Sequence, residues 1–441
     1  MPYISNTDNE RKQMLAEIGV DKFEKLVENI PQKFRENVKL QLGDAMSELE
    51  ISRKISELAN KNNAIVNSFL GAGIYDHFIP AAVDHIVLNP EFHTAYTPYQ
   101  AEVSQGTLQY IYEYQTLICE LTGMEISNAG MYDGATAAAE AILMAVRKTK
   151  KFRAVIAGTV NPDFIEVIKA YTEGIEIELI TIPVKNGQVD LDILKTEMND
   201  ETACFLLQTP NYFGNIEDVF AIEKIVHATK KALFITAVDP ISLSLLNAPS
   251  EYKADIVIGE GQALGNGMNF GGPLFGFLAT NLKLSRSMPG RIVGATLDAD
   301  GETAYALTLQ AREQHIRRAK ATSNICSNEA LCCLAATVYM CLMGKDGMKK
   351  VAEQSATKAH YLANEIEKLD GFSRTFNVPF FKEFAINTPI PAKKIIEKLK
   401  VKNIFPGVAI GENMLLLAVT EKKRKCDLDE LVKALAEVQN D

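Results

Sequence analysis

Residues 128–151 of this 441-residue chain, NAGMYDGATAAAEAILMAVRKTKK, place small residues at the start of an alanine-rich helix. Free backbone N–H groups and the helix dipole make such a start suitable for binding a phosphate group. The contacting residues would be Gly134, Ala135 and Thr136. An ordinary capped helix with Asp133 or Thr136 near its start explains the same segment, so both interpretations stand.

Two later segments carry complementary chemistry. The apolar run ALFITAVD (232–239) ends in Asp239, a carboxylate that can pair with a pyridinium nitrogen or simply open the turn DPIS. The segment ADIVIGEGQALGNGMNFGGP (254–273) is typical of a strand that enters a glycine-rich turn. In one large class of vitamin B6 enzymes, a lysine at the end of such a strand holds pyridoxal phosphate as a Schiff base. Here Gln262 or a neighbour occupies that position. Because an amide cannot form an imine, the phosphate cradle and the carboxylate are present without a covalent anchor.

Two other kinds of cofactor site fit the sequence poorly. In GEGQALG (259–265) the third glycine comes one residue late and no helix follows, whereas a dinucleotide site needs a helix N-terminus for the pyrophosphate. His77, His85 and His93 are spaced by eight and lack a partner of the HExxH kind. We therefore predict no metal site, and expect histidines that are singly satisfied or face a substrate.

The pattern of apolar runs predicts an α/β protein in three segments. Residues 1–65 read as amphipathic helices, residues 66–320 as a large α/β domain, and residues 321–441 as a small C-terminal α/β domain. From about residue 128, nearly continuous apolar strands alternate with helices, which is typical of a parallel sheet covered on both faces. Ligands of such sheets bind at the carboxyl ends of the strands.

The composition excludes several classes of function. A formal charge of −10 argues against an extended nucleic-acid surface. The polar start of the chain and the lack of an apolar run of about 20 residues predict a cytoplasmic protein without a membrane segment. The seven cysteines form no CxxC pair, and Cys332 and Cys333 lie in an apolar helical run, so we expect reduced, buried thiols.

Long strings in this chain resemble, end to end, the N-terminal (alpha) subunit of the P-proteins of the glycine cleavage system. The strings that carry the resemblance are FHTAYTPYQAEVSQGTLQ (92–109), LTGMEISNAGMYDGATAAAEA (121–141), VDPISLSLL (238–246), GEGQALGNGMNFGGPLFGF (259–277), MPGRIVGATLDADG (288–301) and LQAREQHIRRAKATSNIC (309–326).

The resemblance implies a type I pyridoxal-phosphate (aspartate aminotransferase-like) fold with a mainly parallel sheet of the seven-stranded type. It also implies two homologous halves, with the Schiff-base lysine and its pyridoxal phosphate on a C-terminal (beta) partner subunit. The absence of lysine near Gln262 then follows the family rule. Further implied partners are glycine and the lipoyl group of the H-protein, in a complex expected to be α2β2.

For this chain the resemblance implies a supporting role, completing the partner's pocket and the lipoyl entrance. Its loop offers hydroxyl, amide and carboxylate groups for proton transfer, expected near the strand ends. The candidates are Tyr96, Thr97, Tyr99, Gln100, Glu102, Ser104 and His77. A structural loop whose tyrosines pack between subunits explains the same residues.

Two other functions stay open. The chain could be a structural or regulatory pseudo-enzyme that stabilises its partner without touching substrate. It could also be a self-sufficient aminotransferase whose lysine comes from an unexpected position.

Overall fold

The computed structural model describes residues 6–35, 43–62, 67–94, 96–269 and 271–438. The chain divides into two compact units, residues 1–64 and 65–441. The first unit contains the helices α1 (Asp8–Ile18), α2 (Phe23–Leu26), α3 (Gln32–Arg35) and α4 (Glu48–Ala59). Helix α4 begins at a capping box, in which the Ser47 side chain accepts from the Glu50 amide and the Glu50 carboxylate accepts from the Ser47 amide.

A large sheet of seven strands forms the centre of the second unit, in the order β2-β10-β9-β8-β7-β3-β4. Its strands are β2 (Ile126–Ser127), β3 (Arg153–Ala157), β4 (Glu178–Ile182), β7 (Thr202–Thr209), β8 (Leu233–Val238), β9 (Ile256–Glu260) and β10 (Gly276–Thr280). The five strands from β9 to β4 are parallel, and β10 is antiparallel to both of its neighbours. The predicted α/β class and mainly parallel sheet are confirmed.

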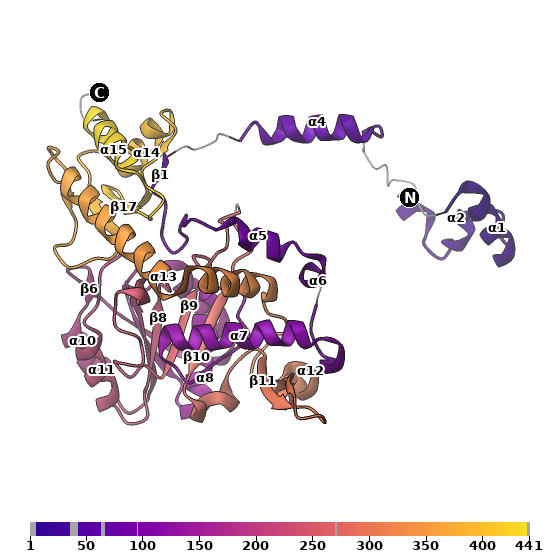
Figure 1. Cartoon of the computed structure of the whole chain (residues 1–441), viewed down its shortest axis with the longest axis horizontal. Coiled ribbons are helices and arrows are strands. Elements are labelled where there is room, and N and C mark those ends of the chain that lie inside the picture. Colours follow the sequence, from indigo (N-terminus) through magenta and orange to yellow (C-terminus); the bar gives the residue numbers. More distant parts are fainter. Residues whose placement is uncertain (1–5, 36–42, 63–66, 95, 270, 439–441) are drawn as a thin grey trace. The chain divides into compact units, whose positions relative to one another are not determined.

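Helices cover the large sheet, which explains why its strands are almost wholly apolar. These helices are α7 (Gln105–Thr122), α8 (Gly134–Thr149), α9 (Pro162–Thr172), α10 (Leu191–Glu197) and α11 (Val219–Ala228). Helix α8 lies against β7, β9 and β10 (Figure 1). Its alanines Ala137, Ala138 and Ala141 are completely buried, because only small side chains permit so close an approach.

A small antiparallel sheet near the C-terminus has the order β13-β14-β17-β16. Its elements are β13 (Ser373–Arg374), β14 (Glu383–Asn387), β16 (Val408–Gly411) and β17 (Met414–Ala418), with the helices α14 (Ala392–Lys400) and α15 (Lys425–Val438). A further pair, β1 (Asn67–Ser68) with β15 (Ile404–Phe405), ties the start of the second unit to this region.

Helix α13 (Ala330–Ile366) connects the regions of the two sheets (Figure 1). Its backbone leaves helical geometry at Gly344, where two helical pieces join. The first piece contributes Tyr339 to the core around the large sheet, and the second contributes Leu362 to a separate core around the small sheet. Because α13 belongs to both cores, the predicted boundary at 320/321 stays a prediction.

Helix α13 is also the one helix, among the described residues, that is long and apolar enough to cross a membrane. Half of its apolar stretch is buried inside the protein, and core helices meet the same criterion, so this is weak evidence for a membrane segment. The prediction of buried thiols is confirmed for Cys332 and Cys333 on this helix, which are free, whereas Cys326, Cys341 and Cys426 are exposed.

The turn after β7 and the segment that enters β14 lie in close contact between the two sheets. After β7, Gly214 adopts a φ of +81°, and a Cβ atom there would lie 1.8 Å from the carbonyl oxygen of Glu383. The Gly214 carbonyl accepts a hydrogen bond of 3.1 Å from the Phe381 amide. This contact fixes the backbone that carries residues 381–383 against the carboxyl end of β7.

We expect Gly214→Ala to destabilise the chain, since it combines a left-handed backbone conformation with a steric overlap. The loss of unfolding free energy should be at least about 2 kcal/mol. Thermal unfolding followed by circular dichroism measures it. Gly174→Ala is the matched control, because its added methyl group would meet no atom within 4 Å. Equal melting temperatures for the two variants would contradict the prediction.

Candidate functional site

A small cavity lies at the carboxyl ends of β7, β8 and β9, where ligands of parallel sheets bind. Its walls include Gln208, Asp239 and Glu260 from the large sheet, and Lys382 and Glu383 from the segment that enters β14. The cavity has a volume of about 40 Å³. Pockets for small ligands usually measure roughly 300–1,000 Å³, so the chain's own side chains occupy most of this site.

An internal ion pair closes one side of the cavity. The Lys382 Nζ atom lies 2.7 Å from Asp239 Oδ2, and the lysine side chain is 1% exposed. The same ammonium lies 3.8 Å from the centre of the Tyr75 ring, a cation–π contact. Asp239 also accepts a hydrogen bond from the Ile241 amide, so it opens the predicted turn while pairing with a cation.

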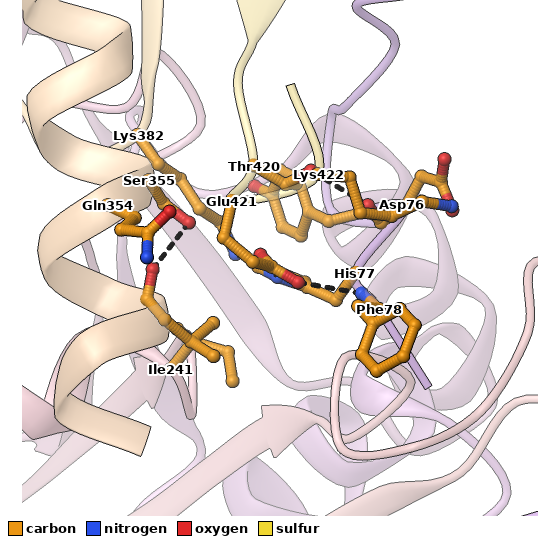
Figure 2. Close-up of polar contacts among 12 residues, drawn as sticks. Asp76, His77, Phe78, Ile241, Gln354, Ser355, Lys382, Thr420, Glu421 and Lys422 are labelled. Atoms are coloured by element: carbon orange, nitrogen blue, oxygen red, sulfur yellow. Dashed lines mark hydrogen bonds and ion pairs between the residues drawn. The ribbon is translucent and has the colours of Figure 1, made fainter. Parts of the chain in front are cut away.

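His77 joins this ion pair to a second carboxylate. Its Nδ1 lies 2.6 Å from Glu421 Oε2, and its Nε2 lies 2.9 Å from Lys382 Nζ (Figure 2). Burial and the nearby Lys382 cation lower the pKa of His77, which favours the neutral ring. In this state Nε2 accepts from the Lys382 ammonium and Nδ1–H donates to Glu421, so both ring nitrogens have partners.

Glu383 binds the segment that leads to His77. Its two carboxylate oxygens accept hydrogen bonds from the Ala72 amide at 2.7 Å and from the Tyr75 hydroxyl at 2.8 Å. Burial raises the pKa of Glu383 to about 7, while these hydrogen bonds and Lys382 act in the opposite direction. The glutamate therefore holds residues 72–75 against the small sheet.

Gln262 occupies the turn after β9, where the sequence predicted it in place of lysine. The residue is 2% exposed. Its amide oxygen accepts from the Tyr75 amide, and its amide nitrogen donates to the carbonyls of Tyr75 and Asn266. The side chain thus binds three backbone groups and offers no amine to a carbonyl compound.

The start of α8 is also satisfied by the chain itself. The Gly134 amide donates to Glu260 Oε2 at 2.9 Å, and the Thr136 amide donates to Asp133 Oδ1 at 2.7 Å. Ala135 is buried between them. The helix is therefore capped by Asp133, and its first amide binds the carboxyl group of Glu260, whose pKa burial raises to about 8.

The candidate loop does not line this cavity, and its expected place at the partner's pocket stays a prediction. None of its six described candidates, Tyr96, Thr97, Tyr99, Gln100, Glu102 and Ser104, is among the residues that line the cavity. The helices α5 (Ala81–Val87) and α6 (Pro90–His93) separate this loop from His77 along the chain. Only His77 of the predicted residues around the partner's pocket is joined to the cavity, through Lys382.

The loop residues are exposed at their tips. The Tyr96 side chain is 78% exposed, and its hydroxyl lies 2.9 Å from Ser327 Oγ. The Tyr99 hydroxyl accepts a hydrogen bond from Arg291, at the start of β11 (Ile292–Leu297). The Tyr99 ring also contacts Arg291 and His315, yet both tyrosines remain more than half exposed, so the loop presents aromatic and polar groups to its surroundings.

Several charged residues of the cavity and its network had no role assigned from the sequence, namely Glu260, Lys382, Glu383 and Glu421. Lys382 and Glu383 gave one signal that was overlooked, namely two charged residues directly before an apolar strand, in FFKEFAIN (380–387). Glu260 lies in the glycine-rich turn GEGQALG (259–265), but no local pattern indicates its partner. The pairing of Lys382 and Glu421 with His77 spans more than 300 positions, which no local pattern reports.

The order of the large sheet, the carboxylate at the end of β8 and the helix that starts at Gly134 define the fold of type I pyridoxal-phosphate enzymes. A solved glutamate decarboxylase from Lactobacillus brevis shares this fold, with a TM-score of 0.70 and 12% identity over 93% of this chain and 96% of its own.

The chain belongs to the glycine cleavage system P-protein family, whose model matches residues 1–435. It is 51% identical to a probable glycine dehydrogenase (decarboxylating) subunit 1 of Chloroherpeton thalassium, over 99% of this chain and 100% of the relative. A crystal structure of glycine decarboxylase (P-protein) in inhibitor-bound form has a TM-score of 0.92 and 39% identity, over 99% of this chain and 100% of the other. The family resemblance seen in the sequence is confirmed.

The raised pKa of Glu383 predicts a specific pH dependence. Between its ordinary pKa of 4.5 and the folded value of about 7, the folded chain holds a proton that the unfolded chain releases. The contribution of Glu383 to stability therefore falls as the pH rises through this range. We expect wild type to lose up to about 3 kcal/mol relative to Glu383→Gln between about pH 5 and pH 8.

Thermal unfolding of both proteins across this pH range measures the effect. Glu412→Gln, which changes an exposed carboxylate in the same region, is the control and should follow wild type. Parallel stability curves for wild type and Glu383→Gln would show that Glu383 does not titrate as described.

Proposed function

We propose that this chain is the lysine-free alpha subunit of a two-subunit glycine decarboxylase and acts only with its lysine-bearing beta subunit. The observation that carries the proposal is Gln262, which is buried and bound to three backbone groups at the position where this fold places a Schiff-base lysine. The full-length similarity to relatives named glycine dehydrogenase subunit 1 supports the assignment.

In this proposal the pyridoxal phosphate is bound covalently to the partner, where it supplies an electron sink for the decarboxylation of glycine. The co-substrate is the lipoyl group of the H-protein, which accepts the aminomethyl group. This chain contributes the exposed loop, with Tyr96, Tyr99, Gln100 and Glu102 at the partner's pocket or the lipoyl entrance. Exposed aromatic side chains are suited to contact with a partner subunit, and polar side chains are suited to proton transfer.

The finer features of the assembly are also proposals. An α2β2 complex agrees with the two homologous halves expected for the family, and the cytoplasm agrees with the composition of the chain. The phosphate cradle from Gly134 to Thr136 and the carboxylate of Asp239 are proposed to be remnants of a cofactor site. Their hydrogen bonds to the chain's own side chains support this assignment.

One observation favours a second candidate function, a structural or regulatory pseudo-enzyme. The cavity at the strand ends is filled, and the candidate loop residues lie outside it. A subunit that only stabilises its partner would have the same features. The two functions differ in the consequence of changing the loop, which affects turnover in the first case and not in the second.

The isolated chain is expected to be inactive, because no amine is available at position 262. Glycine–bicarbonate exchange should be absent for this chain alone, and should appear when the lysine-bearing subunit, pyridoxal phosphate and H-protein are added. Exchange by the chain without its partner would contradict the proposal. The same assay with the lysine-bearing subunit alone shows whether this chain is needed.

Tyr96→Phe and Gln100→Ala test the loop. In the assembled complex, each is expected to lower glycine–bicarbonate exchange at least about tenfold if the lost group takes part in proton transfer. Complex formation, measured by analytical ultracentrifugation, should remain. Tyr361→Phe is the control, since it removes a tyrosine hydroxyl that binds Asp429 far along the chain from the loop. Unchanged exchange would favour the pseudo-enzyme.

A further inference from the structure

Pyridoxal phosphate bound in this cavity would place its phosphate at the start of α8, and Glu260 occupies this position. This residue ends β9, and its carboxylate accepts hydrogen bonds from the Gly134 amide at 2.9 Å and the Gln262 amide at 3.0 Å. Gly134 is the first residue of α8, where the helix dipole favours a negative charge. A phosphate group bound at this helix start would need the amide that Glu260 already uses.

The end of β9 approaches the start of α8 closely. A Cβ atom at Gly134 would lie 2.9 Å from the Glu260 amide nitrogen, so the backbones of α8 and β9 are in contact. The carboxylate of Asp133 takes the Thr136 amide. The amides of Gly134 and Thr136 at the N-terminus of α8 are therefore already bonded to side chains of the chain, and a phosphate group would have to displace these hydrogen bonds.

Lys382 occupies the position beside Asp239 where the pyridinium nitrogen of a cofactor would lie. Its ammonium lies 2.7 Å from Asp239, the carboxylate at the end of β8. A pyridinium nitrogen would need this carboxylate, and the ammonium supplies the same positive charge from within the chain. Because Lys382 is buried, its positive charge is stabilised by the Asp239 carboxylate, and the carboxylate is stabilised by the lysine in turn.

These contacts leave no room for an aromatic ring with its phosphate. The volume that remains is about 40 Å³, compared with roughly 300–1,000 Å³ for ordinary pockets of small ligands. The residues of this chain therefore do not fit pyridoxal phosphate, although the fold is that of enzymes that use it.

We propose that Glu260 and Lys382 replace the anionic and cationic ends of a bound cofactor, and so exclude pyridoxal phosphate from this chain's own pocket. The exclusion comes from filled positions as well as from the missing lysine. Restoring a lysine at position 262 is then insufficient to restore binding. This inference concerns the pocket of the chain alone and does not depend on the role of the loop.

The test compares Gln262→Lys with the triple variant Glu260→Ala/Gln262→Lys/Lys382→Ala. Each full-length chain is incubated with pyridoxal phosphate, reduced with borohydride and mapped by mass spectrometry of its peptides. The triple variant is expected to give an adduct at position 262 with a yield at least about tenfold higher than the single variant, since the competing buried charges are gone.

A matched control combines Gln262→Lys with Glu251→Ala and Lys402→Ala, which remove one exposed charge of each sign. This control should behave like the single variant. One equivalent of adduct at position 262 in the single variant would overturn the proposal. Failure of a folded triple variant to form the adduct would overturn it as well.

The wild-type chain provides a second measurement that needs no change in the buried network. After incubation with pyridoxal phosphate and reduction, Lys382 should carry no adduct, because its ammonium is paired with Asp239 and enclosed. A single stoichiometric adduct at Lys382 would overturn the proposal, and would place an accessible amine in this pocket.

Discussion

The contact between Lys382 and Asp239 is the interaction on which the arrangement of the cavity depends. It joins the end of β8 in the large sheet to the segment that enters the small sheet. Both charges are withdrawn from water, so each is tolerable only with the other in place. His77 and Tyr75 are arranged around the same ammonium. The segment that contains them is thereby held against both sheets.

The rest of the cavity follows from the requirement that buried polar groups be satisfied. A cofactor pocket without its cofactor would leave the amides at the start of α8 and the carboxylate of Asp239 without partners. In this chain Glu260 binds the Gly134 amide, Lys382 binds Asp239, and Gln262 binds backbone groups of the turn and of Tyr75. The fold is thus retained while its ligand positions are satisfied from within. Type I pyridoxal-phosphate architecture and cofactor binding are separable properties, since function is set by a site and not by a fold.

Sequence patterns predicted the elements whose burial depends on neighbouring residues, and did not predict contacts between distant residues. The parallel strands and helix α8 were predicted because apolar runs and helical periodicity report the burial of neighbouring residues. The position of the exposed loop was not predictable from the same signals. His77 and Lys382 are separated by 305 positions, and their contact depends on how the small sheet packs against the large one.

The sequence by itself determined that this chain has no amine at the turn after β9, that its core is a mainly parallel α/β sheet, and that it belongs with the P-proteins. These properties are written in residue types, local periodicity and long matching strings. Only the tertiary structure decided which groups occupy the pocket, and that the tyrosine-rich loop lies outside it. The physical reason is that a buried charge selects its partner by proximity in space. That proximity arises from strand crossovers and the packing of two sheets, which no short stretch of residues encodes.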